Sequence, residues 1–198
     1  MKYQEFKNAI NKPYFSRMDL LLSKVDFFGH QLSLWRKNGY LEHIKRGWDV
    51  FSDEKEKLSS EEISFLIYQP SYLSLEYALS YYGIIPEMVF AKTCVTTKTT
   101  RNFSNSFGVF SYRHIQPKLF FGYIVKETVY GKYLIAEPEK ALLDYLYFYL
   151  GKIHDEKDIS ELRLNKEELK KTINKKKLDK YLCEFGIQKL EKIIRMII

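Results

Sequence analysis

Apolar side chains recur at helical spacing through the first third of the chain. Phe6 and Ile10 lie four residues apart and predict a short helix over residues 2–10. The pattern Ser16-x-x-Asp19 is typical of a capping box, in which a hydroxyl and an acid begin a helix. We expect this second helix to bury a face made of Met18, Leu21 and Leu22. Residues 24–29 are predicted to be a short connection.

The spacing then changes from helical to strand-like. Leu32 and Trp35 predict a third helix from about His30 to Asn38, which Gly39 ends. Two alternating runs, residues 40–44 and 48–51, flank a turn that contains glycine and predict a β-hairpin. Three helices followed by a hairpin predict a winged helix-turn-helix domain over residues 1–52.

A polar segment from Ser52 to Ser60 is predicted to be a linker to a second domain. Ser59-x-x-Glu62 is another capping box and predicts a helix through Tyr68. Ser74 is expected to cap a helix from Leu75 to Tyr82. Runs rich in Val, Phe, Thr and Tyr predict strands at residues 88–99, 107–115, 119–126 and 128–135, with a polar turn from Arg101 to Ser106.

The last third of the chain has a helical pattern. Pro138 suits the first position of a helix that runs to about Leu150. The tail from Ser160 is helical, with breaks near Asn174 and Gly186. The fold class is therefore α+β: the winged helix-turn-helix, a mixed antiparallel α+β domain over about residues 59–155, and a helical tail. The second domain with its tail spans residues 59–198.

Three features of residues 68–198 are interpreted as structural. The tyrosines of residues 68–86 are expected to build a packed helix pair, because aromatic stripes usually form core. Lys140 and Asp144 are expected to form an i,i+4 pair worth a few tenths of a kcal/mol. An apolar stripe in the tail is expected to pack within the chain; it comprises Ile187, Leu190, Ile194 and Ile197.

Composition narrows the class of protein. The chain has 198 residues, 45% of them apolar and 16% aromatic, which excludes disorder as the main state. Only two cysteines occur, Cys94 and Cys183, so a disulfide scaffold is excluded and both are expected to be inert core thiols. No signal peptide or membrane-spanning run is present, and we expect a cytoplasmic protein that contacts no membrane.

Motifs for catalysis and cofactor binding are absent. The chain has no P-loop, no GxGxxG, no CxxC and no GxSxG, and its four histidines lie far apart. We therefore expect no enzyme, no cofactor and no metal, although an activity that leaves no short motif stays open. The net charge is +7, and residues 1–52 hold nine basic against five acidic residues, which favours an anionic partner for this part.

The candidate DNA-binding residues surround the predicted third helix. Its side opposite Leu32 and Trp35 carries His30, Ser33, Leu34 and Lys37, with Gln31 and Arg36 at the flanks. Gln31 has the chemistry for adenine, and Arg36 or Lys37 for guanine or phosphate. Lys45 and Arg46 are expected at the wing tip, and Ser16 and Arg17 at a phosphate-binding helix start. The alternative is a non-enzymatic protein-interaction module that does not bind DNA.

Three segments also resemble one known family. They are Leu34-Trp35-Arg36-Lys37-Asn38-Gly39-Tyr40-Leu41 followed by Lys45-Arg46-Gly47-Trp48, then Pro70-Ser71-Tyr72-Leu73-Ser74-Leu75-Glu76-Tyr77-Ala78-Leu79 through Gly83-Ile84-Ile85-Pro86, then Ala136-Glu137-Pro138-Glu139-Lys140-Ala141-Leu142-Leu143-Asp144. Together they resemble the AbiEi-family antitoxins over roughly residues 5–150. The resemblance implies an antitoxin of a type IV toxin–antitoxin system that provides abortive phage infection. Such a protein represses its own promoter by binding inverted repeats in double-stranded DNA. It also counteracts a nucleotidyltransferase-like toxin without a stable complex.

Overall fold

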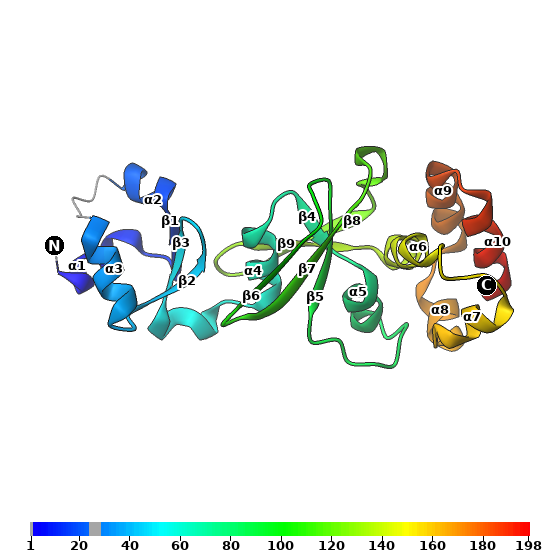
Figure 1. The fold of residues 1–198 in the computed structure, drawn as a ribbon, viewed down its shortest axis with the longest axis horizontal. Helices are drawn as coiled ribbons and strands as arrows, with labels where there is room; N and C mark the ends of the chain where they lie inside the picture. Colours follow the sequence, from blue (N-terminus) through cyan, green and yellow to red (C-terminus); the bar gives the residue numbers. More distant parts are fainter. Residues whose placement is uncertain (1, 24–28) are drawn as a thin grey trace.

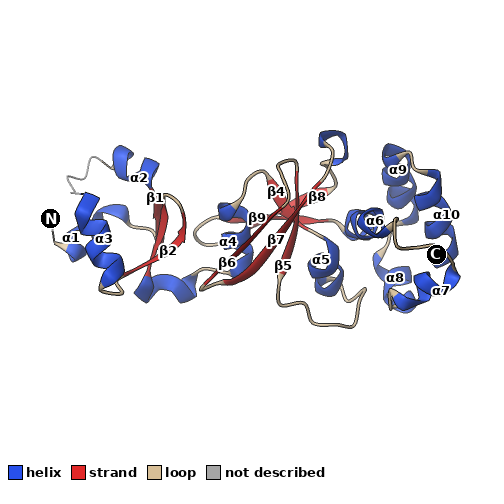
Figure 2. Ribbon diagram, in the orientation of Figure 1, coloured by secondary structure: helices blue, strands red, loops and turns tan. Residues whose placement is uncertain are grey.

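Three parts follow one another along an elongated molecule (Figure 1). The computed structural model describes residues 2–23 and 29–198. Residues 24–28, which make up most of the predicted connection, lie outside the described residues. An N-terminal module is followed by a central sheet, and a group of helices forms the C-terminal end (Figure 2).

The N-terminal module contains the three predicted helices and the predicted hairpin. Its elements are α1 (Tyr3–Ile10), β1 (Tyr14–Ser16), α2 (Arg17–Leu22), α3 (Gly29–Lys37), β2 (Leu41–Lys45) and β3 (Trp48–Phe51). The strands form an antiparallel sheet in the order β1-β3-β2. The sequence did not predict β1, because three residues are too few to show an alternating pattern.

Local signals begin and end these helices as expected. The Ser16 hydroxyl accepts a hydrogen bond from the Asp19 amide, and the Asp19 carboxylate accepts one from the Ser16 amide, so the capping box is confirmed. Gly39 follows α3 with φ of 76°, a left-handed conformation that favours glycine. The module has its own apolar core, made of Phe6, Phe15, Leu20, Leu32, Trp35, Leu41 and Phe51.

The predicted buried face of α2 is wrong. Met18, Leu21 and Leu22 are 62%, 73% and 74% exposed, and Leu20 is the buried residue of this helix. Successive helical residues point about 100° apart, so the inward turn of Leu20 directs its apolar neighbours outward.

The predicted linker is an ordered connection. Residues Ser52–Lys57 form a short 3-10 helix, η1. Lys7 of α1 holds it through ion pairs to Asp53 at 2.6 Å and to Glu54 at 3.0 Å.

The central part is a six-stranded mixed sheet. Its strands are β4 (Ser71–Leu73), β5 (Lys92–Thr96), β6 (Arg101–Asn105), β7 (Gly108–His114), β8 (Tyr123–Glu127) and β9 (Lys132–Ala136), in the order β6-β7-β5-β4-β9-β8. The pairs β4–β9 and β5–β7 are parallel, so the predicted antiparallel sheet is corrected to a mixed one. Helices α4 (Ser60–Ile67) and α5 (Leu75–Tyr81) pack against it, and a 3-10 turn, η2 (Pro117–Leu119), precedes β8.

Two strands of this sheet were not predicted. Residues 101–105 form the edge strand β6 where a polar turn was expected, because an edge strand with exposed sides needs few apolar residues. The buried strand β4 is only three residues long, too short for a pattern.

The C-terminal part is helical, as predicted. It comprises α6 (Pro138–Tyr149), α7 (Glu156–Glu161), α8 (Lys166–Thr172), α9 (Lys175–Phe185) and α10 (Gln188–Ile197). Asn174 caps the start of α9 and Gly186 ends it, which confirms both predicted breaks. Leu190 and Ile194 are buried within the chain, as expected, whereas Cys183 is exposed and not a core thiol. No helix within residues 2–23 and 29–198 is long and apolar enough to cross a membrane.

Helix α6 lies between α5 and the C-terminal helices, and this position overturns two expectations (Figure 1). Lys140 and Asp144 pair as predicted, but both side chains are 0% exposed, so the expected few tenths of a kcal/mol, a value for solvated pairs, does not describe this pair. Ser74 does not cap α5; its hydroxyl donates a 2.8 Å hydrogen bond to the Asp144 carboxylate. Tyr72 is buried in β4, so the tyrosine-rich segment packs as a strand followed by one helix and not as the expected helix pair, and Tyr81 is 50% exposed.

Candidate nucleic-acid interface

A groove of about 380 Å³ lies between α2, α3 and the β2–β3 turn. Its polar lining includes Arg17, Ser33, Arg36 and Asp49, and its apolar lining includes Leu20, Leu21 and Leu32. The predicted DNA-binding residues lie on or near the elements that form this groove.

Helix α3 presents the predicted polar side to solvent. Leu32 and Trp35 are buried against the module core, which turns the opposite side outward. His30, Ser33, Leu34 and Lys37 are exposed, and Gln31 is half-buried. The sequence therefore placed this helix face correctly, because it follows directly from which residues are buried.

Arg36 is engaged within the protein. Its Nε and Nη2 atoms each donate to one Asp49 carboxylate oxygen, both at 2.6 Å. The Asp49 carboxylate is almost fully buried, and its hydrogen bonds raise the pKa of Arg36. His43 is exposed, and its Nδ1 atom lies 3.4 Å from the same carboxylate. This bidentate geometry fixes Arg36 and offsets its charge, so Arg36 is poorly placed to contact guanine.

The two candidate residues at the start of α2 have different environments. Ser16 is buried, and its hydroxyl is used in the capping box with Asp19. Arg17 is exposed, and its amide donates to the Gly47 carbonyl oxygen at 3.0 Å. This bond brings Arg17 beside the β2–β3 turn, which carries the exposed Arg46. Neither arginine, nor Lys37, forms an ion pair with another described residue.

Lys45 does not extend into solvent from the β2–β3 hairpin. Its Nζ atom donates to the carbonyl oxygen of Ile67, at 2.9 Å, and lies 5.5 Å from the centre of the Trp48 ring. Burial lowers the pKa of Lys45, with a smaller contribution from Lys98. The expected phosphate contact at this position is therefore replaced by a contact with α4.

A second cationic region was missed by the sequence prediction. No Asp or Glu occurs between Glu87 and Glu127, whereas six Lys and Arg do. They are Lys92, Lys98, Arg101, Arg113, Lys118 and Lys126. Residues 53–136 together hold nine basic and eight acidic residues, so their net charge of +1 conceals this run; seven of the eight acids precede it.

The structure gathers part of this run around one aromatic ring. Lys98 and Arg101 are exposed, and their cationic groups lie 5.5 and 6.0 Å from the centre of the Tyr68 ring. Tyr68 directly follows Ile67, whose carbonyl oxygen accepts from Lys45, so this region adjoins the β2–β3 hairpin. A charged surface next to an aromatic ring is suited to a nucleic-acid backbone.

The N-terminal module also exposes apolar side chains. Met18, Leu21 and Leu22 of α2 are joined by Leu34 of α3, which is 51% exposed. Large apolar side chains that are exposed together on one helix, as on α2, are typical of surfaces that contact another macromolecule.

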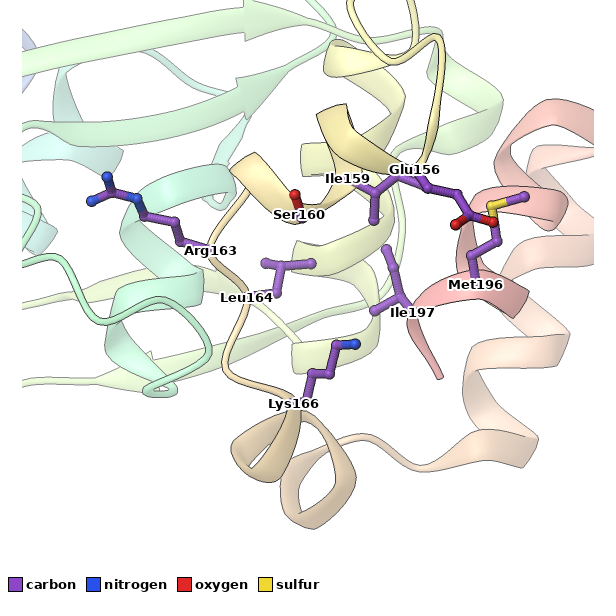
Figure 3. Close-up of a pocket in the computed structure, with 8 residues that line it drawn as sticks. All are labelled: Glu156, Ile159, Ser160, Arg163, Leu164, Lys166, Met196 and Ile197. Atoms are coloured by element: carbon purple, nitrogen blue, oxygen red, sulfur yellow. The ribbon is translucent and has the colours of Figure 1, made fainter.

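A separate pocket of about 380 Å³ lies among the C-terminal helices (Figure 3). Ile159, Leu164 and Ile197 converge there, whereas Arg163 points away. Its eight lining residues include one carboxylate, Glu156, and no histidine or cysteine. The described part of the chain also holds no group of three His, Cys, Asp or Glu side chains able to bind a metal ion.

The sequence matches no protein-family model, and it matches no curated protein.

Proposed function

We propose that this chain is a DNA-binding transcriptional autorepressor whose residues 1–52 form a winged helix-turn-helix. The observation that carries the proposal is the solvent-facing side of α3. It presents His30, Ser33 and Lys37 to solvent, and Ser33 lines one groove with Arg17. Arg17, and Arg46 in the β2–β3 turn, have no carboxylate partner among the described residues.

The order of elements supports this assignment. The module runs α1-β1-α2-α3-β2-β3 with a three-stranded antiparallel sheet, and a winged helix-turn-helix places its third helix in the major groove. In that position, Gln31 and Ser33 would face base edges. Arg17 and Arg46 would contact phosphates on either side of the helix.

The cationic run of the central sheet supplies additional phosphate contacts. Lys98 and Arg101 adjoin the hairpin, so a duplex that follows the module also passes these side chains. Each phosphate contact steepens the salt dependence of binding by about 0.9 in the log–log slope.

The test of DNA binding is a gel-shift series with the promoter of the chain's own gene at several salt concentrations. Lys37→Met and Arg17→Met are expected to weaken binding and to flatten the salt slope. Lys176→Met removes an exposed cation from the distant α9 and is the matched control. Absent or salt-insensitive binding by the wild type overturns the proposal, and so do Lys37→Met and Arg17→Met variants that bind like Lys176→Met.

We further propose that the protein is a cytoplasmic, non-enzymatic antitoxin. The support is the resemblance of residues 70–86 and 136–144 to the AbiEi-family segments. Its functional partner would be a nucleotidyltransferase-like toxin, with no stable complex between them. Co-expression with such a toxin from the neighbouring reading frame is expected to restore growth. Failure to restore growth, with both proteins present, contradicts the antitoxin assignment.

One observation favours a second candidate, a protein-interaction module. The exposed side chains of Met18, Leu21 and Leu22 form an apolar surface beside the groove. Apolar side chains make no favourable contact with a charged phosphate backbone. Capture of the adjacent gene product, lost in Leu21→Asp, together with no affinity for DNA, would favour this function over repression.

A further inference from the structure

The β2–β3 hairpin is packed against the central part of the chain. Ile44 of β2 and Val50 of β3 are buried in the large core that continues through the sheet to α10, and not in the core of their own module. A wing that contacts DNA freely would instead project into solvent beyond its module.

Lys45 anchors the hairpin to α4. Ile67 is the last residue of α4, and the carbonyl groups of the last helical turn have no acceptor role within the helix. The Lys45 ammonium group donates to the Ile67 oxygen at 2.9 Å. A cation at this end also interacts favourably with the helix dipole, so the contact is stabilised in two ways.

Other polar contacts join the same two parts at separate points. The Tyr14 hydroxyl of β1 donates to the Tyr130 carbonyl oxygen, in the β8–β9 turn, at 3.0 Å. Asn105, at the end of β6, donates to the Ile44 carbonyl oxygen at 3.4 Å. Contacts to α4, to β6 and to the β8–β9 turn therefore hold the module at three separate points.

We propose that the β2–β3 hairpin is a fixed joint between the two parts, and that Lys45 is a positioning residue for DNA binding and not a phosphate contact. This inference rests on the proposed DNA-binding function. The joint holds α3 and the cations Lys98 and Arg101 in one arrangement before DNA arrives. Binding then costs no ordering of one part against the other, which is the advantage of pre-organisation.

Salt-dependent affinity for duplex DNA separates positioning from phosphate contact. Lys45→Met is expected to weaken DNA binding about fivefold, because it removes one hydrogen bond that holds the joint. The slope of affinity against salt concentration should not change. Arg46→Met, one residue along the chain, is expected to flatten the slope by about 0.9. Lys45→Arg keeps a cationic donor and is expected to restore affinity.

Tyr14→Phe tests the joint without any change of charge. It removes only the hydroxyl that reaches Tyr130, so it is expected to weaken binding at constant slope, as Lys45→Met does. In the free protein, both variants are expected to speed tryptic cleavage after Lys55 and Lys57 in η1 about threefold, because proteolysis follows the population of the open form.

The binding experiments distinguish a failure of the positioning role from a failure of the proposed DNA-binding function. If the wild type binds DNA and Lys45→Met flattens the slope as Arg46→Met does, Lys45 contacts phosphate and the inference is overturned. It is also overturned if Lys45→Met and Tyr14→Phe bind as tightly as the wild type. If the wild type does not bind DNA at all, the proposed function fails first and the positioning role fails with it.

Discussion

Replacement of Lys140 by methionine tests the buried ion pair of α6. The Lys140 ammonium pairs with Asp144 and donates to the Tyr72 hydroxyl at 2.8 Å. Asp144 also accepts from Tyr72 at 2.9 Å and from Ser74 at 2.8 Å. The Lys140 Nζ atom lies 5.2 Å from the centre of the Phe121 ring and 5.1 Å from that of the Phe185 ring, so methionine leaves an apolar side chain in apolar surroundings.

The cost of the change comes from the carboxylate that remains. Both side chains are 0% exposed, and removal of one partner from a buried pair typically costs about 3–5 kcal/mol. For a chain of 198 residues this corresponds to a fall in Tm of about 10 °C. In Lys140→Met/Asp144→Asn the amide oxygen still accepts from Tyr72 and Ser74 while the charge is removed, and about 2 kcal/mol should return.

The pH dependence of the stability of Lys140→Met tests the same reasoning independently. Burial raises the pKa of Asp144, and the Lys140 ammonium opposes this rise. Without Lys140 the folded-state pKa lies further above the unfolded value, so the folded state binds the proton more tightly. Stability is then greater at low pH and is lost as pH rises through the folded pKa. The difference between variant and wild type is therefore expected to be smaller near about pH 5 than near about pH 8.

Urea unfolding followed by circular dichroism measures these differences. Arg195→Met is the matched control, because Arg195 and Glu191 have the same i,i+4 spacing on an exposed helix face, and its cost should stay below about 0.5 kcal/mol. A Lys140→Met variant as stable as Arg195→Met would refute the reasoning. A double variant less stable than Lys140→Met would do the same.

Three further predictions concern other side chains. Arg36→Met leaves the buried Asp49 carboxylate without its bidentate partner and should lower stability by about 1–2 kcal/mol in thermal unfolding, whereas a variant with unchanged Tm would show that this pair is not structural. Lys98→Met should flatten the salt slope of DNA binding by about 0.9 without a change in Tm; an unchanged slope would remove Lys98 from the interface. Burial raises the pKa of Cys94 to about 12, so a thiol reagent near neutral pH should label only the exposed Cys183 in the native protein and both cysteines after denaturation. Labelling of Cys94 in the native protein would contradict its burial.

Elements whose signals are local were predicted well. The capping box at Ser16 and the one at Ser59 both form, because the residues that make them are three apart in the chain. The exposed side of α3 was also predictable, since Leu32 and Trp35 identify its buried side. The cationic run after Glu87 was present in the sequence and would have been found by a scan for the longest segment without acids.

Partners distant in sequence account for the errors. Arg36 and Lys45 are exposed candidates when the chain is considered alone, but Asp49 and the end of α4 engage them in the fold. Ser74 resembles a helix cap, yet Asp144, seventy residues later, is its partner.

The sequence by itself determined the helices of the N-terminal module, its hairpin and most later elements, because backbone hydrogen bonding and capping depend on near neighbours. Only the tertiary structure decided which polar groups have partners inside the protein. The free energy of a charged side chain depends on what the fold brings within about 4 Å of it, and desolvation makes an internal partner more favourable than an exposed position without one. For that reason the pair on α6 is a core element, and Lys45 of the β2–β3 hairpin contacts the end of α4.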